Sequence, residues 1–170
     1  NTVVVTDSKG CTATAVANIT STGGPTLSVT SQTNVNCFGA NTGTATVAGS
    51  GGTGPYTYTW TPGNLTGATQ TSLTAGTYTI IAMDANSCAG TNTLVITQPT
   101  AALSAIISAT SSAGCGASTG GATVTASGGT AGYTYSWTPS GGTTPGVSNL
   151  GSGNNTVTVT DVKGCTITAV

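Results

Sequence analysis

Aromatic residues alternate with hydroxyl residues in Tyr56-Thr57-Tyr58-Thr59-Trp60-Thr61-Pro62. The pattern returns about 77 residues later as Tyr133-Thr134-Tyr135-Ser136-Trp137-Thr138-Pro139. Alternation of this kind is typical of a half-buried β-strand, because successive side chains point to opposite faces of a sheet. The sequence therefore predicts a strand that occurs twice, each time with its aromatic side chains on one face.

The same spacing relates other parts of the chain. The Gly-rich segment Ser50-Gly51-Gly52-Thr53 returns as Ser127-Gly128-Gly129-Thr130. A short motif occurs three times, as Asp7-Ser8-Lys9-Gly10-Cys11, Asp84-Ala85-Asn86-Ser87-Cys88 and Asp161-Val162-Lys163-Gly164-Cys165. Spacing shared by so many positions indicates a tandem repeat of about 77 residues.

The period divides the chain into three parts. We expect residues 1–24 to be the final hairpin of a preceding repeat, 25–99 to be one repeat, and 100–170 to be a second repeat whose last strand is truncated. An isolated hairpin is only marginally stable in water. This organisation favours a segment of a longer array, or a subunit that its neighbours complete.

Each repeat consists of short alternating runs bounded by Gly, Pro and Asn, which indicate an all-β unit. No stretch has helical periodicity over the length that a stable helix needs. The pattern predicts tandem Ig-like or fibronectin-like β-sandwich repeats. The candidate strands are 27–35, 44–49, 56–61, 69–73, 77–83 and 90–97, and then 103–109, 121–126, 133–138, 146–149, 155–160 and 166–170.

The composition excludes several classes of function. Charged residues make up 3% of the chain, with Lys+Arg 2, Asp+Glu 3 and His 0. Nucleic-acid binding needs more basic residues than this, and no apolar run is long enough for membrane insertion as a helix. Acid–base catalysis would have to proceed without His, Glu or Arg, so we expect no enzyme activity. The composition favours an extracellular structural or binding module.

The aromatic row has two interpretations. Since alternate residues of a strand share a face, the row predicts a structural core made of Trp60 and Tyr58 in one repeat and Trp137 and Tyr135 in the other. The alternative is an exposed platform that stacks on sugar rings, as in a carbohydrate-binding module. We favour the core, because each repeat has few other large apolar side chains.

A second motif, Leu73-Thr74-Ala75-Gly76-Thr77-Tyr78, is typical of the corner at which a sandwich chain passes between sheets. In such a corner the Tyr hydroxyl binds the backbone. The second repeat has Asn155 in place of Tyr78. We therefore expect the tyrosine to be dispensable for the fold and to have no catalytic role.

The aspartates Asp7, Asp84 and Asp161 fall in predicted hairpin turns, where a carboxylate accepts hydrogen bonds from nearby backbone N–H groups. Calcium is the only cofactor that they suggest. It needs several oxygen ligands, and one carboxylate per repeat is too few. We expect no cofactor and no metal site.

The cysteines recur with the repeat and indicate disulfides in an oxidising compartment. We expect bonds within each repeat, Cys37 with Cys88 and Cys115 with Cys165, and an upstream partner for Cys11. The series Cys11–Cys37 with Cys88–Cys115 also respects the period. A bond between repeats, such as Cys37–Cys165, respects it as well and would join neighbours covalently.

The motif order resembles the SprB-type repeat of gliding-motility adhesins. The likeness rests on Asn36-Cys37-Phe38-Gly39, Gly43-Thr44-Ala45-Thr46-Val47 and the segment Gly51 to Trp60, followed by Gly76-Thr77-Tyr78-Thr79 and Asp84-Ala85-Asn86-Ser87-Cys88. The chain departs from the pattern at Ser87, where the family usually has Gly. In the second repeat it also departs at Asn155 and at Gly116-Ala117.

The resemblance implies a long cell-surface protein of tandem Ig-like repeats, exported by the type IX route of gliding bacteria. It implies a structural and adhesive segment of an extracellular filament or stalk, with no catalytic residues. Expected partners are neighbouring copies or repeats of the same kind, and surface polysaccharide is a further candidate. The alternative function is the carbohydrate-binding module described above.

Overall fold

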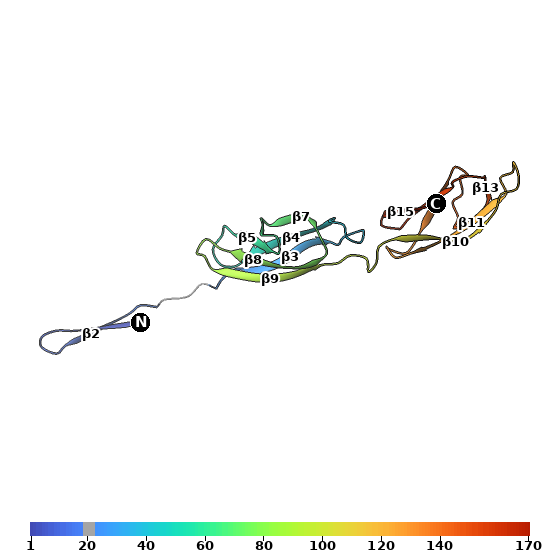
Figure 1. The fold of residues 1–170 in the computed structure, drawn as a ribbon. Helices are drawn as coiled ribbons and strands as arrows, with labels where there is room; N and C mark the ends of the chain where they lie inside the picture. The colour runs from blue at the N-terminus through green and yellow to red at the C-terminus, as the bar shows by residue number, and fades with distance from the viewer. Residues whose placement is uncertain (19–22) are drawn as a thin grey trace.

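A computed structural model describes residues 1–18 and 23–170, which form three groups of strands (Figure 1). We call them the N-terminal hairpin, the first sandwich and the second sandwich. The hairpin is β1 (Thr2–Thr6) and β2 (Thr12–Val16). The first sandwich is β3 (Thr26–Thr33), β4 (Gly43–Ser50), β5 (Thr57–Thr61), β6 (Leu65–Thr66), β7 (Thr69–Leu73), β8 (Gly76–Met83) and β9 (Ala89–Ile96). The second sandwich is β10 (Ser104–Ser111), β11 (Gly120–Ser127), β12 (Thr134–Thr138), β13 (Gly146–Leu150), β14 (Thr156–Thr160) and β15 (Thr166–Ala169).

Each sandwich consists of two antiparallel sheets. In the first sandwich the strand orders are β3-β4-β7 and β6-β5-β8-β9. In the second they are β10-β11-β13 and β12-β14-β15, the same arrangement without a counterpart of β6. The described residues contain no helix, and none of them forms a helix long and apolar enough to span a membrane. The predicted all-β fold of repeated sandwiches is confirmed.

The inward faces of the two sheets form the core of each sandwich. Strand β8 shows the expected alternation, since Tyr78, Ile80 and Ala82 are buried and the residues between them are exposed. Their counterparts in β14, Val157 and Val159, are fully buried as well. Full burial of one such aliphatic side chain stabilises the fold by about 1.5–3 kcal/mol. The two cores are separate clusters, so each sandwich has its own apolar centre.

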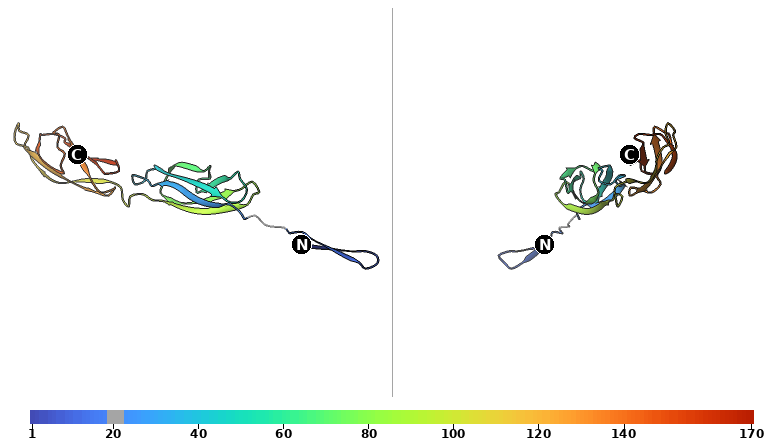
Figure 2. Two further views of the ribbon diagram at one scale, coloured as in Figure 1. Left: turned by 180° about the vertical axis from the view of Figure 1, so that it is seen from behind. Right: turned by 45° about the vertical axis from the view of Figure 1, so that its right-hand side comes forward.

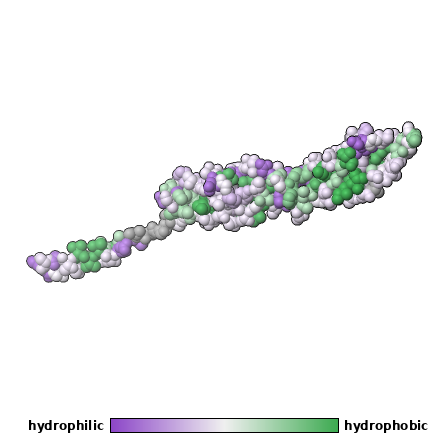
Figure 3. Space-filling view, viewed as in Figure 1, coloured by the Kyte–Doolittle hydropathy of each residue, from purple (hydrophilic) through white to green (hydrophobic). Residues whose placement is uncertain are grey.

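The two sandwiches lie end to end, as Figure 1 and the left view of Figure 2 show. The N-terminal hairpin lies apart from them, and every described residue from 1 to 18 is exposed. Apolar colour marks this hairpin in Figure 3, where Val3, Val4, Val5 and Val16 are between 57% and 72% exposed. The chain is therefore elongated, with an apolar hairpin near one end.

Candidate functional site: a covalent junction between the sandwiches

One disulfide joins the two sandwiches. It links Cys37, in the loop between β3 and β4, to Cys165, in the turn between β14 and β15. The two Cα atoms are 5.7 Å apart and 128 positions apart in the sequence. In the described part of the chain Cys11, Cys88 and Cys115 are free thiols.

The pairing that we expected within each repeat, Cys37–Cys88 and Cys115–Cys165, is wrong. The loop of Cys37 lies beside the end of β9, because the Val35 N–H donates to the carbonyl oxygen of Thr97. Cys88 immediately precedes the start of the same strand. A strand rises about 3.3 Å per residue, so the length of β9 separates the two thiols. They lie at opposite ends of one sandwich, and only a neighbouring sandwich brings a turn cysteine to Cys37.

The turn that carries Cys165 is organised by Asp161. Its Oδ1 accepts hydrogen bonds from the backbone N–H groups of Lys163 and Cys165, each at 2.9 Å. Its Oδ2 accepts one from Thr130 at 2.8 Å, which ties the turn to the Gly-rich loop after β11. Asp161 is only 4% exposed. Its carboxylate thus fixes the backbone on which the disulfide stands.

The turn of Asp84 in the first sandwich has the same geometry. Its Oδ1 accepts from the N–H groups of Asn86 and Cys88, and its Oδ2 from Thr53. In the N-terminal hairpin Asp7 Oδ1 accepts from Lys9 and Cys11 in the same way. The prediction that the aspartates accept backbone hydrogen bonds in hairpin turns is confirmed.

Backbone hydrogen bonds hold the pKa of these carboxyl groups below the ordinary value of 3.8. For Asp84 the bond from Thr53 is the largest cause, and it outweighs the opposing effect of burial. For Asp161 burial is the largest single influence and raises the pKa. The backbone hydrogen bonds, of which that from Thr130 is the strongest, together lower the pKa by more than burial raises it. For Asp7 the bond from Cys11 is the largest cause. A lowered pKa means that the folded turn stabilises the charged carboxylate.

The Gly-rich loop leaves room for this carboxylate. Gly52 and Gly129 have φ angles of +64° and +58°, which L side chains rarely adopt. A Cβ atom on Gly52 would lie 2.5 Å from Asp84 Oδ2, and one on Gly129 would lie 2.6 Å from Asp161 Oδ2. Glycine is therefore required at both positions for the turn to dock on the loop.

The loop that carries Cys37 is held by hydrogen bonds on both sides. The Asn36 N–H donates to Thr42 Oγ1, and the Ala40 N–H donates to the carbonyl of Cys37. The Gly39 N–H donates to Gln98 Oε1, at the start of the segment that leads to the second sandwich. The sulfur of Cys165 lies 3.5 Å from the carbonyl oxygen of Asn36. The disulfide therefore joins two backbone segments that local hydrogen bonds already order.

The aromatic row lies inside the sandwiches. Trp60 is 0% exposed and Trp137 is 2% exposed. Their indole N–H groups donate to the carbonyl oxygens of Gly67 and Thr144. Tyr58 and Tyr135 are partly buried and pack against the same cores. The tryptophans are thus not free to stack on a sugar ring.

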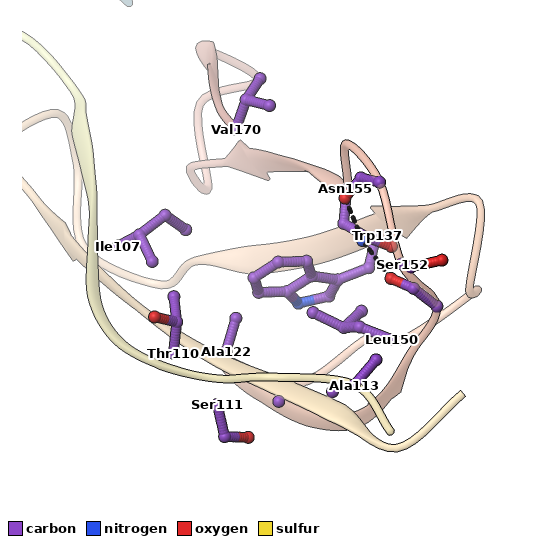
Figure 4. Close-up of a pocket in the computed structure, with 14 residues that line it drawn as sticks. Ile107, Thr110, Ser111, Ala113, Ala122, Trp137, Leu150, Ser152, Asn155 and Val170 are labelled. Carbon is purple, nitrogen blue, oxygen red and sulfur yellow. Dashed lines mark hydrogen bonds between the residues drawn. The ribbon is translucent and has the colours of Figure 1, made fainter. Parts of the chain in front are cut away.

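An apolar cavity of about 320 Å³ lies in the second sandwich beside Trp137 and Leu150 (Figure 4). In the first sandwich the corresponding region contains the buried side chains of Val35, Tyr78, Leu94 and Ile96. In the second sandwich the smaller residues Ala113 and Asn155 replace the first two. The cavity therefore lies where the second core has smaller side chains, and the residues that line it do not form a built ligand site.

The corner hydrogen bond made by Tyr78 is kept by Asn155 in the second sandwich, which the sequence pattern did not reveal. The Tyr78 hydroxyl donates to the carbonyl oxygen of Thr74 at 3.1 Å, as the motif predicted. In the second sandwich Asn155 Nδ2 donates to the carbonyl of Gly151 at 3.0 Å, also four residues earlier. The side-chain amide makes the same bond as the hydroxyl. The hydrogen-bond acceptor four residues upstream of Asn155 is the signal from which this equivalence could have been identified.

No group of three or more potential metal ligands occurs among residues 1–18 and 23–170. The carboxylates of Asp84 and Asp161 each accept three hydrogen bonds from backbone N–H groups instead. The backbone of the turns therefore occupies these carboxylate oxygens.

Comparison with protein families decides what the sandwiches are. A model described as the SprB repeat matches residues 29–65 and again residues 107–142. The chain carries two SprB repeats. Both matched stretches include the loop cysteine, Cys37 or Cys115, whereas the turn cysteines Cys88 and Cys165 lie outside them. The SprB repeat is a structural repeat of cell-surface adhesins, and no curated protein sequence matches the chain.

Proposed function

We propose that this chain is a structural segment of an extracellular surface filament, in which successive SprB repeats are joined covalently so that they carry tension as one fibre. The observation that supports this role is the Cys37–Cys165 disulfide between two sandwiches that lie end to end. Adhesion to surfaces or polysaccharide, export by the type IX route and a part in gliding belong to the same proposal.

The disulfide gives the junction a second covalent connection. The first is the peptide segment between β9 and β10, residues 97–103. When the chain is pulled from its two ends, the force passes from Cys37 directly to Cys165. The residues between the two cysteines are then not extended, even when the sandwiches that contain them unfold. The junction thus limits how far the filament lengthens under load.

The N-terminal hairpin fits this role as the closing hairpin of another repeat. It pairs Thr6 with Thr12, in the register of Met83 with Ala89 in the first sandwich. Val3 occupies the position of Ile80, which is fully buried, yet Val3 is 59% exposed. Such an apolar face is stable only when further strands cover it, and we propose that the other strands of a preceding repeat do so.

Single-molecule stretching tests the proposed function. The chain, held by tags at its two ends, is extended with and without a reductant. The disulfide should hide the 128-residue separation between its cysteines, so reduction should release roughly 420–460 Å of additional length at about 3.3–3.6 Å per residue.

The Cys37→Ser variant should show the full length without reductant, and the matched variant Cys88→Ser should behave as the unmodified chain. Equal lengths for the oxidised chain and Cys37→Ser would overturn the proposal.

A further inference from the structure

Two free cysteines occupy the same places in their repeats as the two bonded ones. Cys115 lies in the loop between β10 and β11, as Cys37 does between β3 and β4. Cys88 lies in the turn between β8 and β9, as Cys165 does between β14 and β15. We propose that Cys115 forms a disulfide with the turn cysteine of a following SprB repeat, at the position of Cys88, so that the junction recurs along the fibre.

The turn of Cys88 is already built like that of its bonded counterpart. The Asp84 N–H donates to the Cys88 carbonyl at 3.0 Å, and the Asp161 N–H donates to the Cys165 carbonyl at 2.9 Å. In both turns the Asp Oδ1 also accepts the N–H of the cysteine at 2.9 Å. The backbone that presents the sulfur is therefore the same whether or not the bond is present.

The loop of Cys115 is likewise built like that of Cys37. The Gly114 N–H donates to Thr119 Oγ1 at 2.9 Å, as the Asn36 N–H donates to Thr42 Oγ1 at 3.0 Å. The loop of Cys115 is one residue shorter and has no counterpart of Phe38. Phe38 is 48% exposed, so it is not part of the core that positions the cysteine.

The two free thiols cannot bond to each other within one chain. Cys88 stands at the start of β9, and the chain then runs through β9, the linker and β10 before it reaches Cys115. Since the sandwiches lie end to end (Figure 1), these cysteines lie at opposite ends of the pair. Cys115 is exposed, and Cys88 is half-buried. Each therefore needs another repeat as its partner, and the two are complementary halves of one junction.

The bond forms between the sulfur atoms of the two cysteines. Their thiols give up two protons and two electrons, and a disulfide of an exported thiol oxidoreductase, or a low-molecular-weight disulfide, accepts the electrons and is reduced to two thiols. Along an array, each junction then has a peptide linker and a disulfide. Two covalent paths then run through the fibre. Each path follows the peptide chain from a turn cysteine through two strands to the loop cysteine of the next repeat, and then crosses the disulfide to the turn cysteine of the repeat after that.

An extended chain tests the proposal. Residues 155–170 repeat residues 1–16, with differences only at Val4/Thr158, Ser8/Val162 and Ala13/Ile167. Residue 154 of one copy can therefore be joined to Asn1 of a complete second copy without changing the period. After folding in a redox buffer of oxidised and reduced glutathione, free thiols are blocked and disulfide-linked peptides are mapped by mass spectrometry.

We expect a peptide that links Cys115 of the first copy to Cys88 of the second, at a yield similar to that of the Cys37–Cys165 link within the second copy. Replacement of the first copy's Cys115 by Ser should leave the second copy's Cys88 as a blocked thiol and leave the Cys37–Cys165 bond of the second copy intact. A blocked Cys115 in the first copy, beside an intact Cys37–Cys165 bond in the second, would overturn the proposal. So would a Cys88–Cys115 link within one copy, or the absence of the Cys37–Cys165 bond on which the equivalence depends.

Discussion

Asn155 replaces Tyr78 at the corner of the second sandwich and makes the same hydrogen bond, from a side chain to the carbonyl oxygen four residues earlier. The amide preserves the bond but not the aromatic ring. Tyr78 is 5% exposed in its own core, whereas Asn155 borders the cavity beside Trp137. The two repeats therefore share this hydrogen bond to the backbone, and they differ in how completely side chains fill the neighbouring part of the core.

The Asn155→Tyr variant should stabilise the second sandwich. A tyrosine ring would fill apolar space and retain a donor for the Gly151 carbonyl, which we expect to add about 1–2 kcal/mol to the free energy of unfolding. The reciprocal Tyr78→Asn variant should cost the first sandwich about 2–4 kcal/mol. Calorimetric unfolding measures both, and a loss of stability in Asn155→Tyr would contradict the equivalence of the two corners.

The Gly129→Ala variant should weaken the docking of the Asp161 turn. Alanine at a positive φ costs about 1–2 kcal/mol, and its Cβ would also lie 2.6 Å from the carboxylate oxygen. Gly52→Ala should have the same effect in the first sandwich. Gly23→Ala is the matched control, because a Cβ there would have no neighbour within 4 Å. Equal stability of all three variants in urea unfolding would show that the carboxylate does not need the glycine.

Acid should destabilise the fold through the aspartates alone. A carboxyl group whose folded pKa lies below 3.8 stabilises the folded state when the pH is above that value, and this contribution is lost as the pH falls through the folded pKa. We expect unfolding free energies that are nearly constant from about pH 5 to 7 and fall below about pH 4. Asp84→Asn with Asp161→Asn should be less stable at pH 7 and should depend less on acid. A marked change of stability between pH 5 and 7 would contradict this explanation, since the chain has no His.

A cut in the linker should not separate the two sandwiches. A chain with a site-specific protease sequence between Pro99 and Thr100 should remain one species after cleavage, because Cys37–Cys165 still joins the halves. Reduction should release them as separate fragments on a denaturing gel. The Cys37→Ser version of the same chain should separate on cleavage alone. Separation of the oxidised parent without reductant would show that the disulfide does not span the junction.

The sequence was sufficient to predict the repeat, the strands and the role of the corner tyrosine, because each depends on local alternation or on a short motif. Strands β5 and β12, for example, lie within the predicted ranges 56–61 and 133–138. The disulfide could not be predicted in the same way. The period allows Cys37 to pair with Cys11, Cys88 or Cys165. The choice depends on which end of a sandwich each loop occupies and on how one sandwich stacks on the next.

Disulfide mapping of the oxidised 170-residue chain tests the central claim most directly. Free thiols are blocked in denaturant before digestion with chymotrypsin, which cuts after Leu27, Trp60, Leu94 and Trp137 and so places the five cysteines on separate peptides. We predict one linked pair, Cys37 with Cys165, and blocked thiols at Cys11, Cys88 and Cys115. A Cys37–Cys88 link together with a Cys115–Cys165 link would show that each repeat is closed on itself, and would contradict the covalent junction.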